Sequence, residues 1–174
     1  MEIRPAALAD LAQIRAIYAH HVTTGLASFE VDPPDEDEIR ARFAAITNAG
    51  YPYLVVIDAA QVLGYAYANY YRTRPAYRHS VEDSIYVAPH AVGRGVGKAL
   101  LTRLVDDCAS RGYRQMLAVI GDSANAGSIG VHRACGFEHA GTLRAIGFKF
   151  GRWVDSVLMQ RALGAGDSSL PPAA

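Results

Sequence analysis

A run of closely spaced glycines constrains the fold of this chain more than any other feature. Residues 86–98 read YVAPHAVGRGVGK and place Gly93, Gly95 and Gly97 between a β-like segment and an amphipathic helical segment. Glycine allows φ > 0 and close approach of the backbone to a ligand, and amides at a helix start attract anions. The run therefore predicts a phosphate or pyrophosphate cradle; the alternative is a glycine-rich turn that binds no ligand.

Two common phosphate-binding loops fit this run poorly. A P-loop needs a glycine, four spacer residues, Gly-Lys and a hydroxyl residue. With Gly-Lys set at 97–98, Val92 and Ala99 occupy the outer positions. A dinucleotide-binding loop that begins at Gly93 would need a glycine in place of Lys98. We therefore expect neither a P-loop NTPase nor a dinucleotide-binding domain.

Hydrophobic periodicity predicts a mixed α/β chain with helices on the faces of a sheet. Segments 53–57 and 62–71 form a hairpin around a turn at 59–60. Segment 115–120 is apolar at successive positions, which predicts a strand buried on both faces. The full set of expected strands is 2–4, 53–57, 62–71, 81–87, 115–120, 137–150 and 153–159, and that of helices is 8–22, 35–47, 96–108 and 125–135.

Length and charge limit the class of protein. A chain of 174 residues, 51% of them hydrophobic, suits one domain, which we place at 1–162. The tail at 163–174 is rich in Gly, Ser, Pro and Ala, and we expect it to be disordered. Lysine plus arginine equals aspartate plus glutamate at 17 each, so no charge excess indicates nucleic acid or an anionic membrane as a partner.

Cysteine and histidine placement gives no sign of a metal centre. The two cysteines, Cys108 and Cys135, exclude a disulfide scaffold and a four-cysteine zinc site. The histidines show no metal-ligand spacing, so we expect no metal.

No apolar run approaches the roughly 20 residues of a membrane-spanning helix, and the first residues lack a signal-peptide core. We therefore expect a cytoplasmic protein with no membrane partner.

The glycine run is similar to the acetyl-CoA pyrophosphate loop of the GNAT N-acetyltransferase superfamily, usually Gln/Arg-x-x-Gly-x-Gly/Ala. Gly95 and Gly97 match this pattern, whereas Val92 stands where Gln or Arg is usual. Asn125, Ser128 and segment 132–137 resemble the second cofactor motif of the family, and the resemblance extends over 2–162. The segments that look like the phosphinothricin and methionine sulfoximine N-acetyltransferase branch are 80–87, 118–121 and 143–149.

This resemblance implies an α/β fold with a mixed, mostly antiparallel sheet of six to seven strands and about four flanking helices. It implies a homodimer that moves an acetyl group from acetyl-CoA to the α-amine of a small amino-acid analogue, such as methionine sulfoximine, methionine sulfone or phosphinothricin. Asn125 and Ser128 also suit a helix N-cap. The residues expected to bind acetyl-CoA are Tyr86, Val87, Val92, Gly93, Arg94, Gly95, Val96, Gly97, Lys98, Asn125 and Ser128.

Acetyl transfer to an amine needs a base and an oxyanion donor, and the leaving thiolate benefits from an acid. The resemblance implies that Glu82 is the base, directly or through a bound water; the alternative is an exposed glutamate at a strand edge. It also implies an oxyanion donor among the backbone N–H groups near Tyr86 and Val87. His132 is the candidate acid; the alternative is a helix histidine that packs or hydrogen-bonds.

The loop at 70–78, YYRTRPAYR, holds three arginines and three tyrosines. Arginine recognises carboxylates in a bidentate way, and aromatic side chains can wall a small pocket. We expect Arg72, Arg74 and Tyr77, together with Phe29, to bind a small amino-acid-like acceptor. The alternative is a solvated cationic loop.

The sequence also allows a different acceptor or a function without catalysis. The acceptor could be a protein N-terminus, a lysine or a polyamine, although an arginine-rich loop suits these cations poorly. A non-catalytic sensor of acyl-CoA would have no need of a base at Glu82. Phe148, Phe150 and Trp153 crowd the last hairpin, either as core or as an apolar patch for a twin subunit.

Overall fold

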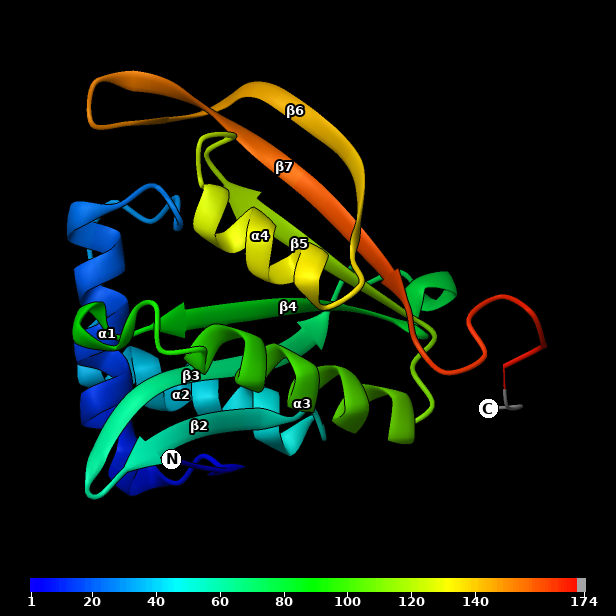
Figure 1. Ribbon diagram of the computed structural model, residues 1–174, viewed down its shortest axis with the longest axis horizontal. Helices are drawn as coiled ribbons and strands as arrows, with labels where there is room; N and C mark the ends of the chain where they lie inside the picture. Colours follow the sequence, from blue (N-terminus) through cyan, green and yellow to red (C-terminus); the bar gives the residue numbers. More distant parts are fainter. Residues whose placement is uncertain (172–174) are drawn as a thin grey trace.

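The computed structural model describes residues 1–171, in which seven strands form one mixed sheet (Figure 1). The strands lie in the order β1-β2-β3-β4-β5-β7-β6. Only β4 and β5 are parallel neighbours; every other adjacent pair is antiparallel. The strand bounds are Glu2–Pro5, Tyr53–Asp58, Gln61–Tyr70, Ser80–Val87, Gln115–Gly121, Glu138–Lys149 and Arg152–Ala162 for β1 to β7.

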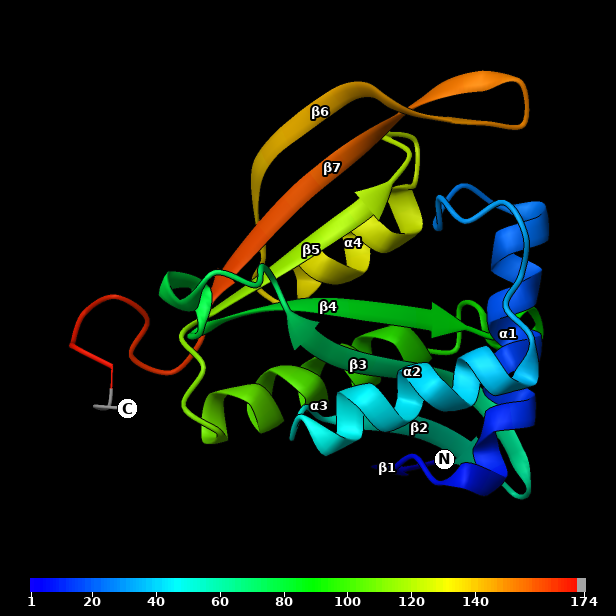
Figure 2. The same ribbon diagram turned by 180° about the vertical axis from the view of Figure 1, so that it is seen from behind.

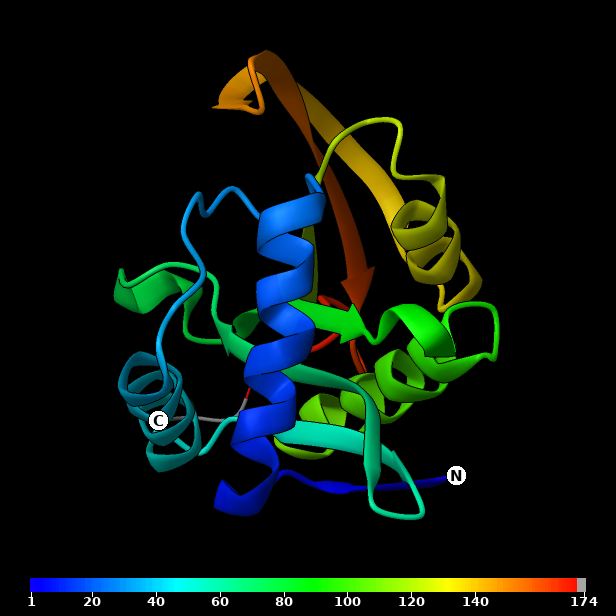
Figure 3. The same ribbon diagram turned by 90° about the vertical axis from the view of Figure 1, so that its left-hand side faces the viewer.

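Four α-helices cover the two faces of this sheet. Helices α1 and α2 lie on one face, and α3 and α4 lie on the other, as Figures 2 and 3 show. The predicted mixed α/β fold with a mostly antiparallel sheet and about four helices is therefore confirmed. The helix bounds are Leu11–Thr24, Glu36–Asn48, Val96–Ser110 and Ala126–Ala134 for α1 to α4, and short 3₁₀ turns span Leu8–Asp10, Pro75–Tyr77 and Pro89–Ala91.

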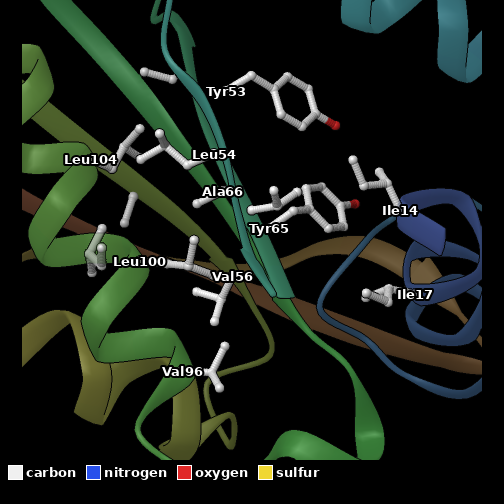
Figure 4. Packing of buried hydrophobic residues seen from close by; sticks show 14 of the residues in the cluster. Ile14, Ile17, Tyr53, Leu54, Val56, Tyr65, Ala66, Val96, Leu100 and Leu104 are labelled. Carbon is white, nitrogen blue, oxygen red and sulfur yellow. The ribbon is translucent and has the colours of Figure 1, made fainter. Parts of the chain in front are cut away.

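The core lies on both faces of the central strands, because successive side chains of a strand point in opposite directions. Figure 4 shows Leu100 and Leu104 of α3 facing one side of the strands and Ile14 and Ile17 of α1 facing the other. All four side chains are buried. Burial of each such side chain contributes about 1.5–3 kcal/mol to the free energy of unfolding. The core thereby holds rigid the strands that carry the site.

Helix ends follow the signals in the sequence. Asp35 is the N-cap of α2, and its carboxylate accepts a hydrogen bond of 2.9 Å from the Glu38 N–H. Gly136 follows α4 with φ of +80°, a left-handed conformation that glycine adopts without strain. These local signals explain why the predicted helix bounds agree with the structure to within a few residues.

Strand β5 differs from its prediction. It was expected to be buried on both faces, yet Val119 is 42% exposed and buried residues alternate with less buried ones over most of the strand. The physical reason is that β5 pairs with β4 only as far as Ala118, so the end of the strand borders a widening gap. An apolar run did not distinguish a strand in the middle of a closed sheet from one beside a gap.

The segment after β7 contacts the start of β5. Leu163 is buried, and its N–H donates to the Arg114 carbonyl at 2.9 Å. The Arg114 guanidinium donates to the carbonyls of Gly166 and Leu170 at 3.2 and 3.1 Å. Part of the tail that was expected to be disordered, 163–171, thus has contacts with the domain, whereas 172–174 lie outside the described residues. The domain limit at 162 stays a prediction.

Candidate active site

Glycines shape the entrance of α3. Gly93 and Gly95 have φ of +81° and +79°, values that favour glycine. Gly95 is the N-cap of α3 and has no side chain to accept hydrogen bonds from the first-turn amides. Because the first N–H groups of a helix have no partner within the helix, those of Val96, Gly97 and Lys98 are placed to bind an anion.

Basic side chains flank this entrance. Arg94 Nη2 lies 3.2 Å from Asp58 Oδ2, so an exposed ion pair ties the loop to the end of β2. Val92 is 69% exposed and brings no polar side-chain group to the loop. A hollow of about 450 Å³ lies on the outer face of α3 next to the loop, lined by Ile3, Gly95, Lys98, Ala99, Thr102, Arg103 and Asp106.

Strands β4 and β5 separate halfway along their length. Their parallel pairing begins at Ser80 and stops at Asp83 of β4, although β4 continues to Val87. Figure 1 shows the two strands diverging toward their C-terminal ends. Segment 84–87 keeps β3 as its partner on the other edge. Its edge toward β5 therefore has no neighbouring strand, which leaves room for a ligand to pair with the backbone near Tyr86.

Glu82 lies where the two strands begin to part. Its side chain is half-buried on the face covered by α1, the same face on which Tyr86 packs edge-on against Tyr18 at 5.0 Å. Burial raises the pKa of the Glu82 carboxyl, the charge of Asp83 raises it further, and the Arg72 guanidinium acts in the opposite direction. A carboxylate of raised pKa is better suited to accept a proton near neutral pH.

His132 is 2% exposed and attaches α4 to the opposite face of β4. Its Nε2 lies 2.9 Å from Asp83 Oδ2, and its Nδ1 lies 2.7 Å from the Ser128 carbonyl oxygen. Burial acts to lower the imidazole pKa, but the hydrogen bond and charge of Asp83 outweigh it, so the pKa is raised. Both partners are acceptors, so both ring nitrogens donate within the protein when the imidazole is protonated. This geometry favours the alternative of a hydrogen-bonded helix histidine over a general acid.

Asn125 is the N-cap of α4. Its Oδ1 accepts from the Ser128 N–H at 3.1 Å, and its Nδ2 donates to the Gly121 carbonyl at 3.4 Å. These bonds place the start of α4 beside the end of β5, at the gap between the strands. Asn125 and Ser128 thus both take part in the N-terminal cap of α4. Their contact with acetyl-CoA stays a prediction.

The arginine- and tyrosine-rich loop joins β3 to β4 beside Glu82. Asn69, three residues before Arg72, pairs with Glu82 across β3 and β4, and the Arg72 charge acts to lower the pKa of the Glu82 carboxyl. The Arg72 guanidinium lies 5.1 Å from the centre of the Tyr71 ring, and Tyr77 packs edge-on against Tyr71 at 5.6 Å. Arg74 is exposed and precedes the 3₁₀ turn at Pro75–Tyr77. An open, cationic loop therefore lies next to the candidate base.

Within one chain, Phe29 lies away from the arginine- and tyrosine-rich loop. A Cβ added to Gly121, at the C-terminal end of β5, would lie 3.2 Å from the Phe29 ring. The arginine- and tyrosine-rich loop instead leads into the N-terminal end of β4, which is parallel to β5. The four residues predicted to bind the acceptor thus flank the separated strands from opposite ends.

The sequence reading missed two buried charged residues near the site. Asp83 could have been found, because adjacent acids in a strand must point to opposite faces, and one next to Glu82 must enter the α3–α4 side. Lys149 gave no local signal: it is 5% exposed, and its Nζ donates to the Ser28 carbonyl, 121 positions away, at 2.7 Å.

Residues 1–171 contain neither a candidate metal cluster nor a candidate membrane-spanning helix. No group of three or more His, Cys, Asp or Glu side chains in this part is arranged to hold a metal ion. Within the same range, none of the helices has the length and apolar character needed to cross a membrane.

The fold and site together define an acyltransferase architecture: a helix N-terminus built for an anion, separated parallel strands and a carboxylate beside the gap. Comparison with known proteins agrees, because a family model described as an acetyltransferase (GNAT) domain matches residues 3–158. The chain belongs to the GNAT acetyltransferase family.

Named relatives cover nearly the whole chain. It is 57% identical over 162 residues to phosphinothricin N-acetyltransferase from Alcaligenes faecalis, covering 93% of this chain and 82% of that protein. It is 43% identical over 159 residues to an L-methionine sulfoximine/L-methionine sulfone acetyltransferase from Pseudomonas paraeruginosa, covering 91% and 92% of the two chains.

Solved structures are also similar. A phosphinothricin acetyltransferase from Sinorhizobium meliloti in complex with AcCoA matches with a TM-score of 0.95 and 50% identity, covering 98% of this chain and 92% of that chain. A ribosomal-protein-alanine N-acetyltransferase from Brucella melitensis matches with a TM-score of 0.91 and 39% identity, covering 94% and 100%.

Proposed function

We propose that this protein transfers the acetyl group of acetyl-CoA to the α-amine of a small amino-acid analogue of the phosphinothricin or methionine sulfoximine type. The observation that carries the proposal is the position of the half-buried Glu82 at the point where β4 and β5 part, on the strand into which the loop with Arg72 and Arg74 leads. Burial there raises the pKa of the Glu82 carboxyl. A carboxylate that accepts a proton and a cation that binds a carboxylate are what an α-amino acid requires. The relatives named above support this acceptor class.

Each step of the proposed reaction is assigned to particular residues of this chain. The first-turn amides of α3 bind the pyrophosphate of acetyl-CoA, which supplies the thioester. Glu82 removes a proton from the acceptor ammonium, and Arg72 and Arg74 bind its carboxylate. The neutral amine attacks the thioester carbonyl to form the C–N bond, and backbone N–H groups near Tyr86 stabilise the tetrahedral oxyanion. The C–S bond breaks as the carbonyl re-forms, and the second proton lost by the attacking nitrogen ends on the leaving thiolate, which departs as the thiol of CoA. His132 and Asp83 act together to position α4.

A thiol-release assay with a panel of acceptors tests this function. The panel contains phosphinothricin, methionine sulfoximine, methionine sulfone, a polyamine and a peptide with an N-terminal alanine. We expect release of CoA thiol with the amino-acid analogues, and mass spectrometry should find the acetyl group on the α-nitrogen. Binding of acetyl-CoA without turnover on any acceptor would instead indicate a sensor.

A protein N-terminus is the second candidate acceptor. The similarity to a ribosomal-protein-alanine N-acetyltransferase supports it, and that substrate also presents an α-amine. It lacks a carboxylate on the same residue, however, so the cationic loop would have no partner. Faster turnover on the alanine peptide than on the amino-acid analogues would favour this candidate.

We also propose that the enzyme is a cytoplasmic homodimer. Phe148, Phe150 and Trp153 are 60%, 58% and 65% exposed, which supports an apolar patch for a second copy rather than core packing. They lie on the β6–β7 hairpin, and β6 is the last strand of the sheet. Sedimentation at micromolar concentration should give the mass of a dimer; a monomer would contradict the proposal.

A further inference from the structure

We propose that Lys149 is a positioning residue for the acceptor, because it holds in place the turn at 28–30 that carries Phe29. The inference rests on the proposed function and adds to it a residue that determines acceptor specificity. Lys149 itself does not touch the acceptor; it acts through Phe29.

The contact of Lys149 joins two distant parts of the chain. Lys149 is the last residue of β6, and its buried ammonium donates to the Ser28 carbonyl at 2.7 Å. The ring centre of Phe150 lies 5.0 Å from the same nitrogen. Burial of an ammonium group costs free energy unless the group is hydrogen-bonded. The bond to the Ser28 carbonyl therefore stabilises the buried Lys149. Figures 1 and 3 show the β6–β7 hairpin reaching over the segment that follows α1.

Ser28 and Glu30, the residues on either side of Phe29, also form hydrogen bonds with α1 and α2. The Tyr18 hydroxyl donates to Glu30 Oε1 at 2.9 Å and lies 2.9 Å from Ser28 Oγ. Arg42 Nη1 donates to the same Glu30 oxygen at 2.6 Å. Helices α1 and α2 thus hold the turn from one side while Lys149 holds it from the other.

The Phe29 ring lies against glycines and keeps an open face. A Cβ added to Gly147 would come within 2.5 Å of Phe29 Cε2, so any side chain there would displace the ring. Phe29 is nonetheless 41% exposed. An aromatic ring with one packed and one exposed face can form the wall of a binding site.

The turn connects to the face of β4 that carries Glu82. The Tyr18 hydroxyl that donates to Glu30 belongs to a ring whose centre lies 5.0 Å from that of Tyr86. Tyr86 and Glu82 point to the same face of β4. A shift of the turn that carries Glu30 and Phe29 would alter the space in which the acceptor amine meets Glu82.

The test compares two variants that disturb the turn from independent directions, each with a matched control. Lys149→Met removes the ammonium, and its control is Arg40→Met, which removes an exposed cation of α2. Gly147→Ala pushes on the ring, and its control is Gly141→Ala, where an added Cβ meets open space on the same strand. Kinetics with phosphinothricin and methionine sulfone are combined with hydrogen exchange of the free proteins.

We expect both Lys149→Met and Gly147→Ala to raise the acceptor KM about tenfold, the first because it removes a charge-assisted hydrogen bond that holds the turn and the second because it displaces the Phe29 ring. The KM for acetyl-CoA should change less than twofold, exchange at 26–31 should accelerate, and both controls should behave as the wild type. An unchanged acceptor KM in Lys149→Met, or an equal rise in the acetyl-CoA KM, would overturn the inference. A wild type that acetylates neither acceptor would instead refute the proposed function, while exchange would still report whether Lys149 holds the turn.

Discussion

The imidazole of His132 and the carboxylate of Asp83 form a pair, with Nε2 and Oδ2 2.9 Å apart and both side chains at most 2% exposed. Glu82, the neighbour of Asp83, points to the other face of β4, which α1 covers. The two adjacent acids therefore have separate surroundings: Asp83 attaches α4 to the sheet, and Glu82 is free for the role of base that we propose for it.

Breaking this pair should destabilise the fold. In His132→Phe, Asp83 is left buried without a partner, and we expect the free energy of unfolding to fall by about 3–5 kcal/mol. Urea denaturation of the wild type and variant measures the difference. A loss below about 1 kcal/mol, which is typical of an exposed pair, would contradict the structural role of His132.

The same pair predicts a pH dependence of stability. Because the pKa of His132 is raised in the folded state, its contribution is complete below the usual histidine pKa of about 6.5 and is lost as pH rises through the raised value. Denaturation between neutral and alkaline pH should show this decline in the wild type. The double variant Asp83→Asn, His132→Gln keeps hydrogen-bonding groups that do not titrate, so it should lack the decline.

The entrance of α3 gives a prediction for acetyl-CoA binding. Gly95→Ala puts a Cβ on a residue with φ of +79°, which costs about 1–2 kcal/mol and displaces the amides of the anion site. We expect a rise in the acetyl-CoA KM. Gly50→Ala is the matched control: Gly50 has φ of +82° and open space around it, but it follows α2. An equal rise in both variants would show that the α3 entrance has no special role.

The charge of Arg72 should affect the pKa of Glu82 that the activity reports. Its charge lowers the pKa of Glu82, although burial and Asp83 raise it more. Arg72→Met removes the lowering effect, so the acid limb of the plot of kcat/KM against pH should move to higher pH, because Glu82 must be deprotonated to act. A limb that stays in place or moves to lower pH would show that Arg72 does not act on the titrating group.

Local patterns predicted much of this molecule, and long-range contacts account for what they missed. Apolar spacing located α3, and Asp35 and Gly136 marked helix ends, because these signals act within a few residues. The partners of His132 and Lys149 lie 49 and 121 positions away, and nothing near either residue in the sequence specifies them.

The sequence indicated candidate site residues but not the geometry that surrounds them. The glycine run and Glu82 were singled out, but the end of pairing at Asp83 is a property of two strands that the pattern of one strand does not contain. For the same reason, the sequence does not show that Phe29 lies by the C-terminal end of β5 and the arginine- and tyrosine-rich loop by the N-terminal end of β4.

The role of Glu82 is tested most directly by the turnover of Glu82→Gln with acetyl-CoA and phosphinothricin across the pH range. The amide keeps the size of the side chain but cannot take the ammonium proton. We predict that kcat falls about 10²-fold or more, the usual contribution of a general base, and that the acid limb disappears from the pH profile. Near-native turnover with an unchanged limb would show that another group removes the proton.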